Sequence, residues 1–405
     1  MAAALVLAVL AAALLLWQQP WRADPERDDA PAPVPADAST RLTAQLRDLT
    51  EADTRAEFVA AAGDLPAGRA FGRRTWSALQ SVASGASLRY ISGGDVPDHA
   101  DGSATAVVEA EWRPAAGSGL DPEVTHRSTV ELRVAPERDG TFSIVGASRL
   151  SGAVPLWLVG PVSVHQDDGR FVVRVDGGDE VLAVDELTSN ARAVVERTLP
   201  GVSGDLTFVS PRTQAQMAAI VGQDTAAVAQ IAAVTTSLDA ESTADGVVVV
   251  LNPAVFPTMD ERAAQIVLTH EAAHALTGAG GTSAENWIVE GFADWVALRS
   301  DAAPLSLSAG QILAEVKAGR TPDQLPSDAD FGSTRHGLGA LYESSWMIFR
   351  LLGERYGDAA VVSFYESALR GASTAEALRS AFGIDREQLT AAWRAYLTKS
   401  ASTVS

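Results

Sequence analysis

Two histidines stand four positions apart in this chain, with a glutamate directly after the first, in the run His270-Glu271-Ala272-Ala273-His274. If the run is helical, both imidazoles lie on one helix face, with their β-carbons about 5–6 Å apart. They can then bind one metal ion at roughly 2.0–2.1 Å. Glu271 projects beside that face, where its carboxylate can act on a water molecule. The alternative is an amphipathic helix with incidental histidines.

An acidic residue on the next predicted helix is a candidate third ligand. Glu290 is surrounded by Ile288, Phe292 and Trp295, and a carboxylate buried among apolar residues needs a cation. Two histidines and one glutamate would hold a zinc ion and leave its fourth position open. Asp294, one turn later, can accept a hydrogen bond from the second nitrogen of a ligating histidine. An ordinary surface acid is the alternative for Asp294.

Two sequence patterns predict where these helices begin. Thr258-Met259-Asp260-Glu261 is a capping box, which predicts a helix from about Met259 to Gly278. Thr282, with Glu285 three residues later, is a second capping box, and it predicts that the next helix starts near residue 283.

A His-Glu-x-x-His pair followed by Glu-Gly-x-Ala on the next helix resembles the gluzincins, the zinc peptidases that include thermolysin and the M1 aminopeptidases. The pattern looks closest to the bacterial proteins called peptidase MA-like, and the resemblance covers residues 247–352. It implies one zinc ion per chain, with His270, His274 and Glu290 as its ligands. The segment between His274 and Glu290 is shorter than in thermolysin or the M1 enzymes. The chain also lacks the Gly-Ala-Met-Glu-Asn segment that binds a substrate's amino terminus in M1 enzymes.

The same resemblance extends to a later helix. Tyr342-Glu343 matches the start of the Tyr-Glu-Lys-Gly pattern of M1 enzymes, with Ser344 and Ser345 in place of Lys and Gly. It implies that Tyr342 donates a hydrogen bond to the developing oxyanion. His336, which precedes this helix in a Gly-rich segment, is a rival donor. The alternatives are a tyrosine packed in the core and a solvated histidine.

The chemistry implied by the resemblance is hydrolysis of a peptide bond in a peptide or protein substrate. Water activated by zinc would attack the carbonyl, with Glu271 as general base. A second hypothesis is a cell-surface binding or scaffold protein that keeps the zinc site without turnover. Glu271 favours the enzyme, because a non-catalytic metal site needs no base beside its open position.

The pattern of apolar residues predicts an α+β fold. Helical spacing over residues 39–62 and 74–82 precedes three strands within residues 106–147, which predicts a small α+β domain over 39–153 that resembles the NTF2-like shape. A hairpin within residues 156–175 opens the predicted zinc metallopeptidase domain, 154–400. Its strand-bearing half ends at residues 247–251, and after Pro257 the chain is predicted to be helical. In gluzincins a strand near the metal-binding helix pairs with substrate, and residues 247–251 are the candidate for it, with an ordinary buried strand as the alternative.

The amino-terminal segment is predicted to tether the protein. Residues 1–17 are wholly apolar, which is short for a spanning helix of about 20 residues, and Trp17 and Trp21 suit a membrane interface. We expect an uncleaved anchor over residues 1–21 and a Pro-, Asp- and Ala-rich linker over 22–38. The folded domains would then lie outside the cytoplasm on the cell membrane. A cleaved signal and a secreted protein are the alternative.

Composition removes several classes of function. The formal net charge of −20 argues against a nucleic-acid partner and against adsorption to anionic lipid. With no cysteine in the chain, thiolate zinc ligands and cysteine nucleophiles are excluded. The other histidines, His99, His126 and His165, have no ligand spacing and are read as structural or exposed.

Overall fold

The computed structural model describes residues 34–177, 184–238, 246–331 and 338–404. The predicted anchor over residues 1–21, most of the predicted linker over 22–38, and His336 lie outside the described residues. Among the described residues, none of the helices combines the length and the apolar character needed to cross a bilayer.

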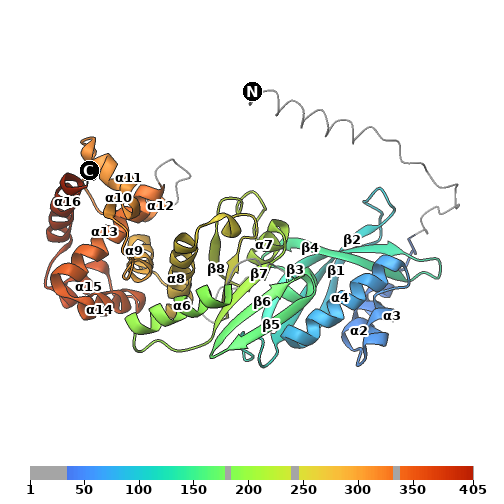
Figure 1. Ribbon diagram of the computed structural model, residues 1–405. Helices are drawn as coiled ribbons and strands as arrows, with labels where there is room; N and C mark the ends of the chain where they lie inside the picture. Colours follow the sequence, from blue (N-terminus) through green and yellow to red (C-terminus); the bar gives the residue numbers. More distant parts are fainter. Residues whose placement is uncertain (1–33, 178–183, 239–245, 332–337, 405) are drawn as a thin grey trace, which may run out of the picture.

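The first part of the chain is a set of helices packed on a four-stranded antiparallel sheet of strand order β1-β2-β3-β4 (Figure 1). Its elements are α2 (Ala38–Thr50), α3 (Arg55–Ala61), α4 (Pro66–Val82), β1 (Ala83–Gly93), β2 (Ala104–Pro114), β3 (His126–Pro136) and β4 (Phe142–Ser151). The helices and β2 to β4 agree with the predicted α+β pattern. Strand β1 was not predicted, because Leu88 is its one buried residue and it shows no apolar alternation.

The middle of the chain forms a five-stranded mixed sheet of order β5-β6-β7-β9-β8. Its elements are α5 (Leu156–Val159), β5 (Val162–Asp167), β6 (Arg170–Val175), α6 (Val184–Thr198), β7 (Leu206–Pro211), α7 (Gln214–Val221), β8 (Ala233–Ser237) and β9 (Val247–Leu251). Strand β9 runs parallel to β7 and antiparallel to β8, so both of its edges are paired. The expectation that residues 247–251 pair with substrate is therefore wrong, and the neighbouring strand β8 is one of the two edge strands of the described sheet, the other being β5.

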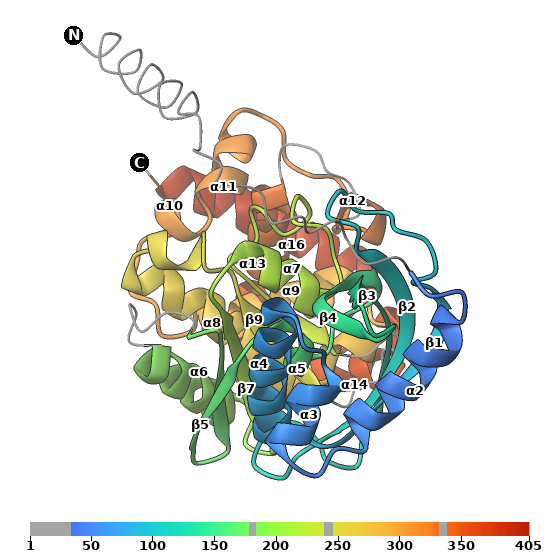
Figure 2. The ribbon, with the colours of Figure 1, turned by 90° about the vertical axis from the view of Figure 1, so that its right-hand side faces the viewer.

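From residue 256 on, the described chain is helical, as the sequence predicts. Its elements are η1 (Phe256–Thr258), α8 (Glu261–Thr277), η2 (Ala279–Gly281), α9 (Asn286–Ala297), α10 (Leu305–Ser308), α11 (Gly310–Lys317), α12 (Asp328–Phe331), α13 (Leu338–Tyr356), α14 (Asp358–Leu369), α15 (Thr374–Phe382) and α16 (Arg386–Thr403). Figure 1 shows the antiparallel sheet at one end of an elongated molecule, the mixed sheet in the middle and these helices at the other end. Figure 2 looks down this long axis, with α2 to α4 nearest the viewer.

Apolar side chains are buried on both faces of the mixed sheet. Val173, Val209 and Val250 pack in one cluster with the antiparallel sheet and Trp157. Residues of the opposite face, such as Val172, pack in a second cluster with α6, α8, α9 and α13. Successive residues of a strand point to opposite faces, which explains the nearly continuous apolar runs of β6 and β9. The first cluster crosses the predicted domain boundary at 153/154, and the boundary itself stays a prediction.

Helix α9 lies unusually close to α13 where the two cross at Gly291. A β-carbon at this position would lie 2.6 Å from the carbonyl oxygen of Ser345 and 2.8 Å from the ring of Phe349. Both distances are shorter than the non-bonded contacts that a β-carbon makes, so glycine fits there without a shift of its neighbours. Glu290 directly precedes Gly291 on α9. The close crossing therefore helps to set how far Glu290 lies from the helix that carries the two histidines.

We predict that Gly291→Ala destabilises the protein although alanine is the better helix former by about 1 kcal/mol. Overpacking should cost about 1–3 kcal/mol in excess of that gain. Gly310→Ala is the control, because Gly310 also lies in a helix but has open space at its β-carbon position. Chemical denaturation measures both free energies of unfolding. Equal stability of Gly291→Ala and wild type would contradict the close crossing.

Candidate metal centre

The helix that carries the two histidines, α8, begins at Glu261 and ends at Thr277. Its cap is Asp260, whose carboxylate accepts a hydrogen bond of 2.8 Å from the amide of Ala263. The predicted start at Met259, with Thr258 as cap, is wrong because Met259 has an extended backbone after the 3-10 turn at Phe256–Thr258. The predicted end is confirmed by Gly278, which takes the left-handed conformation at φ 65°.

The helix that carries Glu290, α9, begins at Asn286, a few residues later than predicted. The hydroxyl of Thr282 accepts from the amide of Ala284 and does not cap the helix. Glu285 does not complete a capping box, because its carboxylate pairs with Arg386 at 2.7 and 2.8 Å and accepts from the Trp287 indole. This ion pair ties the start of α9 to α16. Glu290 lies on α9 as expected.

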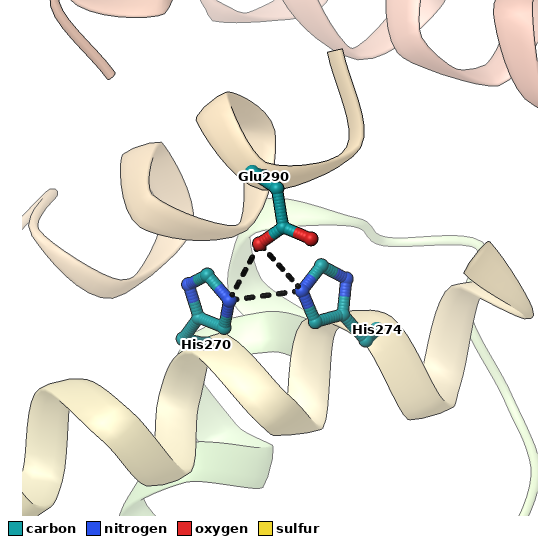
Figure 3. Close-up of side chains that lie close together, drawn as sticks. All are labelled: His270, His274 and Glu290. Carbon is teal, nitrogen blue, oxygen red and sulfur yellow. Dashed lines mark hydrogen bonds and ion pairs between the residues drawn. The ribbon is translucent and has the colours of Figure 1, made fainter. Parts of the chain in front are cut away.

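Three side chains from these two helices converge on one point (Figure 3). The Nε2 atoms of His270 and His274 are 2.9 Å apart. Oε2 of Glu290 lies 3.2 Å from the first nitrogen and 3.4 Å from the second. The three side chains are only 11–21% exposed. This arrangement of one ligand atom from each residue could hold a metal ion.

Asp294 lies behind His270, where the sequence analysis expected it. Its Oδ1 atom is 2.8 Å from Nδ1 of His270. A carboxylate there accepts a hydrogen bond from Nδ1–H, which fixes the tautomer and leaves the lone pair of Nε2 directed at the convergence point. His274 has no such partner among the described residues, and its Nδ1 atom is buried without a hydrogen bond.

The electrostatics of the site favour a positive charge at its centre. Burial lowers the pKa of His270, but Asp294 and Glu290 outweigh it and hold the pKa well above its usual value. Burial likewise raises the pKa of Glu290, yet hydrogen bonds with His270 and His274 bring it below its usual value. Carboxylates held ionised in a buried position need a cation beside them. A divalent ion at the convergence point would provide that charge.

The carboxylate of Glu271 contacts strand β8 and is not one of the three converging side chains. Its Oε2 atom accepts hydrogen bonds from the backbone amide of Thr235 at 2.8 Å and from the Thr235 hydroxyl at 2.7 Å. Glu271 nevertheless lines the same cavity as the metal-site residues, a cleft of about 440 Å³ between β8, α8 and α9. Thr235 could not be predicted from the sequence, because no local pattern shows that β8 lies beside α8.

Tyr342 also lines this cleft. Its ring centre is 6.4 Å from that of His270, and its ring packs edge-on against Phe331 at 5.5 Å. Burial, reinforced by the charge of Glu290, raises the pKa of Tyr342 well above its usual value. The phenol therefore stays protonated at neutral pH and can donate a hydrogen bond into the cleft. Its rival, His336, lies outside the described residues.

No protein-family model matches this chain, and no curated protein matches its sequence. Among solved structures, the chain is similar to one described as a two domain M1 zinc metallopeptidase mutant bound to L-arginine. That likeness has a TM-score of 0.38 and 14% sequence identity, over 78% of this chain and 71% of the other. So remote a likeness leaves the chemistry to be argued from the site itself.

We predict that the protein binds one equivalent of zinc and that His270→Ala and His274→Ala each abolish stoichiometric binding. Asp294→Ala should weaken the affinity by about 10–100-fold, because it removes the partner that orients His270. His165→Ala is the control, since His165 is an exposed residue of β5. Equilibrium dialysis followed by elemental analysis measures all four variants. Full zinc occupancy in both ligand variants would refute the site.

Proposed function

We propose that this chain is a zinc-dependent metallopeptidase that hydrolyses peptide bonds in a peptide or protein substrate. The observation that supports this most directly is the arrangement of four residues in the cleft. His270, His274 and Glu290 lie close enough together to hold one metal ion, while Glu271 lines the same cleft without joining them. A site that only held a metal would not need that fourth group.

The ligand set fits zinc. Two imidazole nitrogens and one carboxylate oxygen are a donor set typical of catalytic zinc, which keeps one position open. The orientation of His270 by Asp294 supplies a nitrogen lone pair at the right place. When bound, zinc polarises a carbonyl group and lowers the pKa of water from about 15.7 to about 7.

The chain's own residues account for the proton transfers. Glu271 would take a proton from the attacking water and pass it to the leaving amine. Tyr342 would donate a hydrogen bond to the carbonyl oxygen as negative charge develops on it. His336 stays a prediction for the same role.

An extended peptide suits the cleft because its wall is an edge strand. Residues of an antiparallel edge strand alternately direct their backbone groups to the partner strand and away from it. The amide of Thr235 points away from β9, toward Glu271, so the backbone of Ala233 faces outward as well. A substrate strand can pair there by adding to the sheet. Ile231 and Val289 line the same cleft and offer apolar contact to substrate side chains.

The location of the protein stays a prediction from the sequence. We propose attachment to the cell membrane through residues 1–21, with the folded domains outside the cytoplasm. Secretion after cleavage of this segment is the alternative.

We predict that Glu271→Gln and Glu290→Gln fail in different ways. Glu271→Gln should keep zinc and stability but lose about 10²–10⁴-fold in rate, because a positioned base is removed. Glu290→Gln should lose zinc affinity and activity together. Glu261→Gln is the control, since Glu261 is exposed on the same helix. Turnover of a quenched peptide library and zinc titration measure the three variants.

Two outcomes would count against the proposal. Loss of zinc in Glu271→Gln, with zinc and activity kept in Glu290→Gln, would reverse the roles. Stoichiometric zinc with no cleavage of any peptide by the wild-type protein would favour a non-catalytic binding or scaffold protein.

A further inference from the structure

Strand β8 and helix α8 are joined by a cluster of hydrogen bonds at one residue pair. The amide nitrogen of Thr235 donates to Oε2 of Glu271 at 2.8 Å. The Thr235 hydroxyl lies 2.7 Å from the same Oε2 and 3.0 Å from the backbone carbonyl oxygen of Glu271. We propose that Thr235 is a positioning residue that fixes the carboxylate of Glu271 for proton transfer, an inference that rests on the proposed function.

The contacts distinguish the two oxygens of the carboxylate. Oε2 is occupied by Thr235, and the described part of the chain provides no hydrogen-bond donor for Oε1. Since Glu271 lines the cleft, Oε1 is the oxygen that is left for water and for the leaving amine. A glutamate without such an anchor can occupy several rotamers on a helix surface. The anchor at Oε2 restricts Glu271 to one of them.

The anchor is itself rigid. Thr235 lies in the middle of β8, where it pairs with Val249 of β9. Strand β9 is an interior strand whose residues Val248 to Leu251 are buried. Catalytic groups held by a regular element keep their geometry better than groups held by loops. The base is therefore positioned from the sheet, while the metal ligands are positioned by the two helices.

Holding α8 on the sheet is not what requires this contact. Helix α8 already buries Ala264, Leu268, Ala272 and Ala273 in the cluster that it shares with the sheet and α9. A contact needed only to dock the helix would not have to involve the side chain of Glu271. The amide of Thr235 donates to the carboxylate that would act as base, and the Thr235 hydroxyl lies nearer to that carboxylate than to the backbone carbonyl oxygen of Glu271.

The kinetic test compares Thr235→Val, which removes the hydroxyl at nearly constant shape, with Thr235→Ser, which keeps it. We expect kcat to fall about tenfold or more in Thr235→Val with KM and zinc stoichiometry unchanged, and to recover in Thr235→Ser. Thr236→Val is the matched control, because the Thr236 hydroxyl donates within its own strand and not to Glu271. An unchanged kcat in Thr235→Val, or an equal loss in Thr235→Ser, would overturn the proposal.

A second readout uses the metal-free protein and needs no activity. Melting temperatures of Thr235→Val, Glu271→Ala and the double variant form a double-mutant cycle. We expect Thr235→Val to lower the melting temperature in the wild-type background and to have less effect in the Glu271→Ala background. Additive shifts would overturn the contact. If the cycle shows coupling but no variant or wild-type protein cleaves peptides, the proposed function fails and the catalytic role of Thr235 falls with it.

Discussion

The balance of charge at the crossing of α8 and α9 is the constraint on which the rest of the site depends. Glu290 and Asp294 approach two imidazoles from one helix, inside a region where few side chains reach solvent. Burial works against every one of these charges, so the arrangement is stable only if positive charge is shared among them. A proton on the imidazole of His270 supplies that charge in the metal-free protein, and a divalent cation would supply it more fully. The metal proposal follows from this balance as much as from the spacing of the histidines.

Contacts around this crossing hold α8 and α9 in place relative to one another. Because Gly291 has no side chain, α9 can pack closely against the backbone of α13. The ion pair of Glu285 with Arg386 holds the start of α9. On the other side, α8 rests on a sheet that is buried on both faces. The proposed ligands thus come from α8 and α9, whereas the proposed base, Glu271, lies on α8 and contacts strand β8. The cleft opens between these three elements.

Much of the site could be predicted because its information is local. The positions of His270 and His274 on one face follow from helical spacing, and the buried setting of Glu290 follows from its apolar neighbours. The helix starts were less well predicted, because the sequence alone does not distinguish Thr258 and Thr282 from Asp260 as N-cap residues. Strand order and the role of Thr235 could not be predicted, because Thr235 lies 36 residues before Glu271 and meets it only through the fold. The expectation that residues 247–251 pair with substrate was wrong for the same reason, because the partners of β9 on both sides are set by the fold.

The most direct test of the central claim is a crystal structure of the zinc-loaded protein, with diffraction data collected on both sides of the zinc absorption edge. We predict one strong anomalous peak at about 2.0–2.2 Å from Nε2 of His270, Nε2 of His274 and a carboxylate oxygen of Glu290. A zinc peak elsewhere on the chain, with His270, His274 and Glu290 still in contact with one another and no peak between them, would contradict the account.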